Sequence, residues 1–340
     1  MNRRRFIRSQ PLGVAQAIVP EPKPLPGDLT LLRVTRRAMA TTFEIAIPYG
    51  TPHALDAATD ALDLIDELED QLSVYRDHSE VSRLNAVAAS QPVVVEDRIF
   101  DLLAHATTHT RDTGGAFDIA SGALIKAWGF HRRQGRIPTA AEHQTAMQMT
   151  GMRHVILDSE RRTVKFRRAG LELNLGAIGK GYALDRAAEL LRNRWGIASA
   201  LLHGGGSSVR AIGIPPGQPR GWAVVVKHPW DESQNLGTVW LVDQGFGTSA
   251  ATFQYFEYKG KKYGHVLDPR TGWPTEGVAS ASVIAPNAAE ADAISTAFFV
   301  LGPEPATQYC RPRPELSAIM LPDSATIPPE VIVIGLDSKL

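Results

Sequence analysis

The side chains that could act together chemically stand near the C-terminal end of the chain. Asp292, Ser295 and Thr296 follow one another at i, i+3 and i+4, so in a helix their oxygen atoms share one face. A carboxylate and hydroxyls on a rigid helical face suit a hard cation that prefers oxygen ligands, such as Mg²⁺. The same spacing is also typical of a solvated polar face, and the spacing alone does not distinguish the two interpretations.

A helix with its own start and stop signals must position these oxygens. Asn287 is a good N-cap, and Glu290, three residues later, completes a capping-box pattern. The helix should run to about Val300 and end at Gly302, which is followed by proline. An apolar stretch over 279–285 predicts a strand that leads into it.

A histidine precedes this strand and helix. His265 lies at the end of a predicted strand over 262–267, just before a tight turn over 268–272. An unperturbed imidazole has a pKa of about 6.5, so it can take up a proton at neutral pH. His265 is therefore a candidate general base.

A glycine-rich turn over 174–181 (NLGAIGKG) opens another predicted helix, with Lys180 in its first turn. Free backbone N–H groups at a helix start, together with a lysine, favour an anion such as phosphate. The turn is not a P-loop, because Gly181 stands where Ser or Thr should follow the lysine. It also lacks the G-x-G start of a dinucleotide fingerprint, so the class of phosphate site stays open.

Two further stretches offer contacts to a flat ligand. Met39 lies in a bend between predicted strands over 31–36 and 42–48, where it is either a core residue or an exposed apolar contact. Gly114 and Gly115 allow a sharp turn before Phe117 and Asp118, a ring and a hydrogen-bond acceptor. The alternative for this second stretch is a plain loop with a core phenylalanine.

Apolar periodicity predicts the remaining elements. A helix after residue 52 has an apolar stripe of Leu55, Ala58, Leu62, Ile65, Leu68 and Leu72, and a second helix fits 97–113. Residues 129–150 are polar and predict a loop, and 163–168 with 171–175 predict a hairpin. Further strands are expected near 198–202, 209–213, 221–228, 237–242, 255–258, 316–321 and 331–335.

Composition excludes several classes of function. The 340 residues are 44% hydrophobic, enough for a large core, and 36 basic residues balance 36 acidic ones. No basic block dense enough for nucleic acid is present. Cys310 is the single cysteine, which excludes an internal disulfide and a cysteine-rich metal site. No apolar run reaches the roughly 18 residues of a membrane-spanning helix.

The N-terminal residues 1–27 read as a targeting segment and linker before one domain over 28–340. Arg3-Arg4-Arg5-Phe6-Ile7-Arg8 resembles a twin-arginine export signal, and Ala15-Gln16-Ala17 could be a cleavage site. Residues 21–27 contain three prolines. We therefore expect a periplasmic or exported protein; the alternative is a basic tail on a cytoplasmic one.

Nine motifs, in family order between about residues 37 and 302, together resemble the FAD:protein FMN transferases, the ApbE-type flavin transferases. They are MATTF (39–43), LSVYRDHSEVSRLN (72–85), GAFD (115–118), WGF (128–130), NLGAIGKGYALD (174–185), GG (205–206), TS (248–249), HVLDPRTGWP (265–274) and ADAIST (291–296). The resemblance implies an α+β fold of two closely packed lobes, each of mixed, largely antiparallel sheet flanked by helices, with FAD between them.

The resemblance also implies roles for single residues. The carbonyl of Ala177 and the side chains of Asp292 and Thr296 match the family's Mg²⁺ ligands, and His265 matches the histidine that assists an attacking hydroxyl. Asp185 would touch the adenosine half of FAD. The positions that match the flavin pocket are Met39, Tyr75, Ala116, Phe117, Asp118, Asn174, Lys180, Asp185 and Val266.

The implied reaction is a phosphoryl transfer in which FAD is the substrate. A Thr or Ser hydroxyl of an acceptor protein attacks the FMN-side phosphorus of FAD and AMP leaves, with Mg²⁺ neutralising charge on the pyrophosphate. The expected partners are FAD and that acceptor, through which the enzyme would associate with a membrane. The alternatives are a Mg²⁺-dependent FAD pyrophosphatase, in which water replaces the hydroxyl, and a protein that binds or delivers FAD without turnover.

The chain departs from the family pattern at several places. Asn174 stands where an aspartate is usual, and Ser295 replaces a frequent second acid, which favours one Mg²⁺ rather than two. The other departures are Ala250, Ala251 and Thr252 after Ser249, Gly264 before the histidine, and Ser207 in place of asparagine. They touch the rim and the loops facing the flavin, and Asn174, Ala250 and Ala251 are what favour the carrier alternative.

Overall fold

The computed structural model describes residues 29–132, 134–231, 233–250, 255–323 and 330–336. The predicted export signal and linker lie outside these residues, as do Ala251 and Thr252. Within the described ranges no helix is both long enough and apolar enough to cross a membrane.

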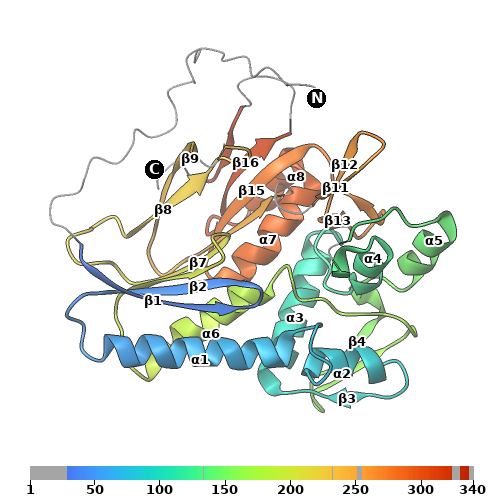
Figure 1. Cartoon of the computed structure of the whole chain (residues 1–340), viewed down its shortest axis with the longest axis horizontal. Coiled ribbons are helices and arrows are strands. Elements are labelled where there is room, and N and C mark those ends of the chain that lie inside the picture. The colour runs from blue at the N-terminus through green and yellow to red at the C-terminus, as the bar shows by residue number, and fades with distance from the viewer. Residues whose placement is uncertain (1–28, 133, 232, 251–254, 324–329, 337–340) are drawn as a thin grey trace, which may run out of the picture.

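A single large sheet organises the fold (Figure 1). Its eight strands lie in the order β1-β2-β6-β7-β10-β15-β16-β17, and every pairing is antiparallel. Their bounds are β1 Leu31–Ala38, β2 Thr41–Pro48, β6 Ala200–Gly204, β7 Ser208–Ile212, β10 Gly245–Ala250, β15 Val278–Ala285, β16 Ser317–Pro322 and β17 Ile332–Ile334.

Three helices cover one face of this sheet and a hairpin covers the other (Figure 1). The helices are α1 (Ala54–Leu72), α6 (Gly179–Asn193) and α7 (Ala288–Leu301), and α8 (Pro303–Cys310) packs beside α7. The hairpin pairs β8 (Trp222–Lys227) with β9 (Asn235–Leu241). Successive side chains of a strand point to opposite faces of the sheet, which explains both layers. Ile45 belongs to the main core under the helices, whereas Ala46 belongs to the core between the sheet and the hairpin.

A smaller helical part shares the main core with the sheet. It contains α2 (Glu80–Val87), α3 (Asp97–Asp112), α4 (Gly122–Ala127), α5 (Ala140–Gln148) and the short helices η1 (Phe130–Arg132) and η2 (Met152–His154). A three-stranded antiparallel sheet, β3-β5-β4, completes it with β3 Val93–Val94, β4 Val155–Asp158 and β5 Thr163–Phe166. The shared core is consistent with two lobes that pack closely, and the predicted α+β class is confirmed.

A third cluster surrounds Trp128 and holds the segment that carries His265. It includes the hairpin of β11 (Tyr255–Tyr258) with β12 (Lys261–Gly264), and the short pair β13 (Leu267–Asp268) with β14 (Trp273–Pro274). The indole N–H of Trp128 donates to the carbonyl of Gly272 at 2.8 Å. The turn after His265 is thereby anchored to the helical part.

Three local predictions from the sequence were wrong. Residues 129–150 contain α5, whose capping box joins Thr139 to Glu142 but whose only buried residue is Ala146, so its apolar stripe is weak. Residues 171–175 form no strand, because the backbone of Leu173 bonds the side chain of Asn85 instead of a neighbouring strand. Leu55 is 57% exposed rather than buried.

The sequence also gave no prediction for β4, α4, α8 or β10. The glycines of β10 at 245 and 247 gave no apolar alternation, yet both are needed, because a Cβ on either would overlap the backbone of α7. Those two glycines leave room for the backbone of α7 against β10.

Candidate functional site

The start of α7 sets the place of the acidic side chain at the centre of the site. Asn287 accepts a hydrogen bond from the N–H of Glu290 at 2.8 Å, so the predicted N-cap is confirmed. Asp292 lies one helical turn beyond the first residue, Ala288. Its side chain points from α7 toward α6 and β7.

Two neutral donors hold the Asp292 carboxylate. Its Oδ2 accepts the N–H of Gly181 and its Oδ1 accepts the hydroxyl of Ser208, both at 2.8 Å. The residue is only 6% exposed, and burial raises the pKa of its carboxyl group, while the charge of Lys180 acts in the opposite direction. Among the described residues no salt bridge reaches this carboxylate, which makes a cation a natural partner.

Hydroxyl groups extend the same face of α7. Ser295 and Thr296 both donate to the carbonyl of Asp292, at 2.9 and 3.1 Å. Ser249 on β10 lies within 3.1 Å of the Ser295 hydroxyl and 3.0 Å of the Thr296 hydroxyl. The predicted face therefore exists, with a further hydroxyl from the neighbouring strand. Because it is largely buried, it is not a solvated surface.

The start of α6 faces this group. Ala177 lies in the turn that leads into α6, and Asn174 shapes that turn by accepting the N–H of Gly176 at 2.9 Å. Lys180 and Gly181 occupy the first helical turn. A side chain at Gly181 would overlap the carbonyl oxygen of Ala288, so only glycine permits this approach of α6 to α7.

Several strand ends meet at the same edge of the sheet. Met39 lies in the turn between β1 and β2, with φ of 49°, and packs partly against the main core. The N–H of Gly205 bonds the carbonyl of Thr42 at 3.0 Å, and the carbonyl of Ser207 accepts the N–H of Thr248 at 2.7 Å. The turns before β2 and β7 and the end of β10 thus lie beside the hydroxyl face.

Four predicted flavin contacts lie in or beside the helical part, and three of them have structural roles there. Ala116 and Phe117 are each 1% exposed in the main core. Asp118 accepts the N–H groups of Ala120 at 2.8 Å and Met152 at 2.9 Å, and burial raises the pKa of its carboxyl group. Tyr75, in contrast, is 65% exposed. Its ring stacks on that of His131 with centroids 4.8 Å apart. Flavin contacts by these four residues stay predictions.

His265 lies between β12 and β13 and is half-buried; the predicted strand over 262–267 is shorter than expected, since β12 ends at Gly264 and leaves His265 just beyond it. The adjacent Val266 accepts the N–H of Thr275 at 2.9 Å and packs partly against the main core. A pocket of about 420 Å³ opens beside this segment. Its lining residues flank His265 on both sides and include one from α7: Lys261, Tyr263, Asp268, Thr271, Trp273, Pro274, Thr275, Glu276 and Val300.

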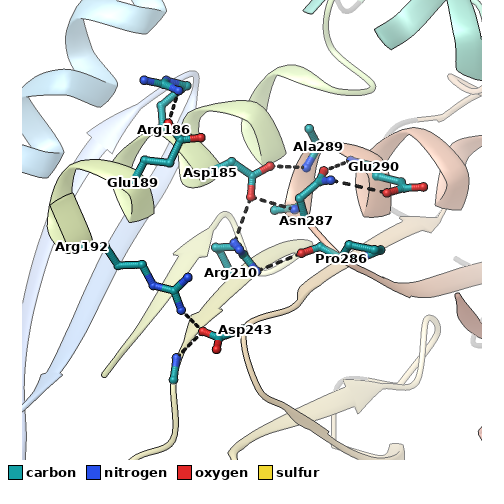
Figure 2. Close-up of polar contacts among 12 residues, drawn as sticks. Asp185, Arg186, Glu189, Arg192, Arg210, Asp243, Pro286, Asn287, Ala289 and Glu290 are labelled. Carbon is teal, nitrogen blue, oxygen red and sulfur yellow. Dashed lines mark hydrogen bonds and ion pairs between the residues drawn. The ribbon is translucent and has the colours of Figure 1, made fainter. Parts of the chain in front are cut away.

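Asp185 lies further along α6, and other residues of the protein bind its carboxylate (Figure 2). Its two oxygens accept the N–H groups of Ala288 at 2.9 Å and Ala289 at 2.8 Å. Arg210 approaches the same carboxylate at 3.1 Å. Burial raises the Asp185 pKa to about 6 despite these partners. Its predicted contact with adenosine stays untested.

The ApbE family model matches residues 39–320. The chain belongs to the ApbE family. A protein of Klebsiella pneumoniae (strain 342) named FAD:protein FMN transferase is 35% identical over 270 residues, which cover 78% of this chain and 81% of that protein. A protein of the same name from Treponema pallidum (strain Nichols) is 34% identical over 288 residues, 81% of this chain and 78% of the relative.

The fold agrees with that membership. The crystal structure of the ApbE protein from Thermotoga maritima has a TM-score of 0.82 with this chain at 27% identity, and the match covers 90% of this chain and 97% of that one. The ApbE-like fold inferred from the nine motifs is therefore confirmed.

The oxygen donors of this ApbE family member fit Mg²⁺. The described residues contain no cluster of three or more acidic, histidine or cysteine side chains. Mg²⁺ usually needs fewer: it keeps several waters and binds one or two carboxylates together with substrate phosphates. Three oxygen ligands of that kind are present: the buried Asp292 carboxylate, which is hydrogen-bonded only by uncharged donors, the Thr296 hydroxyl and the Ala177 carbonyl.

One residue of this site, Ser208, was not singled out from the sequence. Ser208 lies on a strand, and serine has no spacing signal in a strand comparable to i, i+4 in a helix. The glycine pair at 205–206 marked its segment, and Ser249 was marked only as part of the TS motif at 248–249.

Proposed function

We propose that this protein is a Mg²⁺-dependent FAD:protein FMN transferase, which moves FMN from FAD to a Thr or Ser hydroxyl of an acceptor protein and releases AMP. The observation that carries the proposal is the buried Asp292 carboxylate beside the start of α6, in a member of a family whose curated relatives bear that name. An acidic oxygen donor next to a lysine and a helix start suits a metal-bound pyrophosphate.

The transfer requires one bond to form and one to break. The acceptor oxygen forms a bond to the FMN-side phosphorus, and the bond from that phosphorus to the bridging oxygen breaks. AMP leaves with the electron pair of that bond. The hydroxyl proton goes to an imidazole nitrogen of His265, a step that typically contributes about 10²–10⁴-fold to the rate. When bound, Mg²⁺ supplies positive charge at the pyrophosphate oxygens.

The chain's own residues would hold the substrate in line. Lys180 and the positive end of the α6 dipole would supply positive potential where the pyrophosphate would lie. Asp292, Thr296 and the Ala177 carbonyl would hold the metal ion. The pocket lined by residues that precede and follow His265 in the chain would offer room for the acceptor segment.

The flavin would contact the residues at the strand ends and in the helical part. We propose these roles for Met39, Tyr75, Asn174 and Val266, and for the segment 116–118. Met39 and Tyr75 present accessible surface, whereas Ala116 and Phe117 are buried in the main core and would act mainly by supporting the residues that contact the flavin.

We also propose that the enzyme is exported and meets a membrane through its acceptor. The support is the arginine pair Arg3-Arg4 before Phe6. Cell fractionation checks this. The double change Arg3→Lys and Arg4→Lys should retain the protein in the cytoplasm, and unchanged export would contradict the twin-arginine assignment.

Mass spectrometry of an acceptor tests the function. The protein is incubated with FAD, Mg²⁺ and tagged peptides carrying Thr or Ser, and an FMN-sized addition is sought. Asp292→Ala and His265→Ala should abolish it, whereas His228→Ala, which removes another half-buried histidine on the far hairpin, should not. Free FMN and AMP with every acceptor would assign a pyrophosphatase instead, and intact bound FAD would assign a carrier.

A further inference from the structure

Hydrogen bonds connect α6 to α7 at two levels along the helix axes, and these two levels lie one helical turn apart. At the first level the N–H of Gly181 donates to the Asp292 carboxylate at 2.8 Å. At the second level Asp185, four residues later on α6, accepts the N–H groups of Ala288 and Ala289, four and three residues before Asp292. The two helices are therefore held in register by contacts at both ends of the same turn.

Side chains of β7 contact the same two helices at the same two levels. Ser208 donates to Asp292 at 2.8 Å, and Arg210, two residues along the strand, reaches Asp185 at 3.1 Å and the carbonyl of Pro286 at 3.2 Å. Residues two apart on a strand point to the same face. Figure 2 shows Arg210 lying between Asp185 and the segment that enters α7.

The spacings of the three elements match. Four residues of a helix rise about 6 Å, and two residues of a strand rise about 6.6 Å. The step from Gly181 to Asp185, the step from Ala288 to Asp292 and the step from Ser208 to Arg210 therefore cover nearly the same distance. A shift of α7 along its axis would break both levels together.

We infer that Asp185 and Arg210 are positioning residues, which fix the axial position of α7 so that Asp292 and Thr296 hold the metal ion in the geometry that transfer requires. This inference rests on the proposed function. Neither residue touches the reacting atoms; both act through the start of α7.

The surroundings of Asp185 favour this role over a contact with adenosine. Its side chain is 14% exposed, as is that of Arg210, and each of its oxygens already accepts a backbone N–H. A carboxylate at a helix start that binds two free N–H groups satisfies donors that have no partner inside the helix. Arg210 then provides the opposite charge that a buried carboxylate requires.

A neighbouring ion pair supplies a matched control. Arg192, also on α6, pairs with Asp243, which in addition accepts the N–H of Gly213 at 2.7 Å (Figure 2). These side chains are 40% and 49% exposed, and their hydrogen bonds and ion pairs among the described residues join α6 to the segments at Gly213 and Asp243 rather than to α7. Asp243→Asn therefore makes the same chemical change as Asp185→Asn without loosening the start of α7.

Direct measurement of Mg²⁺ binding tests the inference. Mg²⁺ is titrated by calorimetry into the full protein saturated with FAD, without acceptor, and FAD binding is measured separately in EDTA by flavin fluorescence. An asparagine at 185 offers one oxygen to two N–H donors, so α7 loses one of its two hydrogen bonds to this side chain. Asp185→Asn should raise the Kd for Mg²⁺ roughly 10–100-fold, the range found when a partner that orients a metal ligand is removed.

The same change should leave the Kd for FAD in EDTA within about twofold, and Asp243→Asn should change neither constant. Arg210→Lys keeps the charge but not the link to Pro286, and should raise the Mg²⁺ Kd by a smaller factor. If Asp185→Asn does not fold, the Mg²⁺ Kd of Arg210→Lys tests the inference instead.

Each other outcome overturns the inference in a distinct way. An unchanged Mg²⁺ Kd in both variants shows that they do not position the metal ligands, whatever happens to transfer. A weaker FAD Kd with an unchanged Mg²⁺ Kd assigns Asp185 to the flavin pocket. Absence of Mg²⁺ binding in the wild type removes the metal from the proposed function and the inference with it, which separates the two failures.

Discussion

The hydroxyl of Ser208 on β7 donates a hydrogen bond of 2.8 Å to the carboxylate of Asp292 on α7, although 84 residues separate them in the chain. Both side chains are buried, with exposures of 0% and 6%. The sheet therefore orients the carboxylate directly, and the second carboxylate oxygen is oriented by α6 through Gly181. A metal ion at this site would meet a ligand whose rotation is already restricted.

Removal of that hydroxyl is expected to weaken metal binding. Ser208→Ala leaves one oxygen of the buried Asp292 carboxylate without its donor, which should cost stability by about 1–3 kcal/mol and raise the Mg²⁺ Kd by about tenfold. Calorimetry and urea unfolding measure the two effects. Ser317→Ala is the control, because Ser317 is equally buried but donates to Gly335 on the far side of the sheet. Equal Mg²⁺ constants for wild type and Ser208→Ala would contradict the orienting role.

Gly181 is expected to tolerate no side chain. A Cβ there would overlap the carbonyl oxygen of Ala288, a backbone atom that cannot move without displacing α7. Gly181→Ala should lower the free energy of unfolding by about 1–3 kcal/mol or more, the range for overpacked sites. Urea unfolding measures this.

Gly179→Ala, on the same helix, is the control. A Cβ at Gly179 would meet only the Leu175 side chain at 3.8 Å, an ordinary contact, and its φ is not positive. The change should therefore be nearly neutral or slightly stabilising. A loss as large as that of Gly181→Ala would mean that close approach to α7 is not the cause.

The sequence was informative where the signal was local. α7 could be predicted because its N-cap, its capping pattern and its terminal glycine all lie within the helix or beside it. The hydroxyl face followed from spacing alone, since i, i+3 and i+4 positions meet in any helix. The burial of that face could not be predicted, because it depends on β10, whose glycines hide its strand pattern.

Contacts between residues far apart in the sequence could not be predicted, because their signals are not local. The family resemblance implies that Asp185 contacts adenosine, which stays a prediction; the bonds of its carboxylate to the start of a helix 103 and 104 residues later could not be predicted. Residues 171–175 have the right period for a strand, with Leu171, Leu173 and Leu175 buried. The backbone of Leu173 nevertheless bonds a side chain from α2, that of Asn85, and Glu172 and Asn174 bond the backbone of Gly122 and Ile119; no periodicity indicates these partners.

Asp185 should make stability depend on pH in a direction unusual for a carboxylate. Burial raises its pKa to about 6, with Arg210 opposing and Asp292 reinforcing the rise. The folded protein therefore binds a proton more tightly than the unfolded chain. Its contribution is fully present below about pH 4 and is lost as pH rises through about 6.

Comparison with Asp185→Asn isolates this effect. The stability of the wild type relative to the variant should fall by up to roughly 3 kcal/mol between pH 4 and 7. Urea unfolding in EDTA at a series of pH values measures the difference. Parallel stability curves for the two proteins would show that Asp185 keeps an ordinary pKa in the fold.

Trp128 should influence transfer through the turn that follows His265. Trp128 is fully buried, and its indole N–H donates to Gly272 at 2.8 Å while its ring packs edge-on against Trp273, with centroids 5.2 Å apart. Trp128→Phe leaves the Gly272 carbonyl without that donor and should cost about 1–3 kcal/mol of stability. Because the 268–272 turn leads directly from His265, the rate of FMN transfer should fall as well, about tenfold or more.

Trp222→Phe separates the two effects. The Trp222 indole also donates to a backbone carbonyl, that of Ile212 at 3.1 Å, and is also buried, but it lies in the hairpin on the opposite face of the sheet. Both changes should lower the free energy of unfolding by similar amounts, whereas only Trp128→Phe should lower the transfer rate measured well below the midpoint of unfolding. If the two variants lose activity equally, the loss reflects global stability, and the hydrogen bond to Gly272 does not position His265.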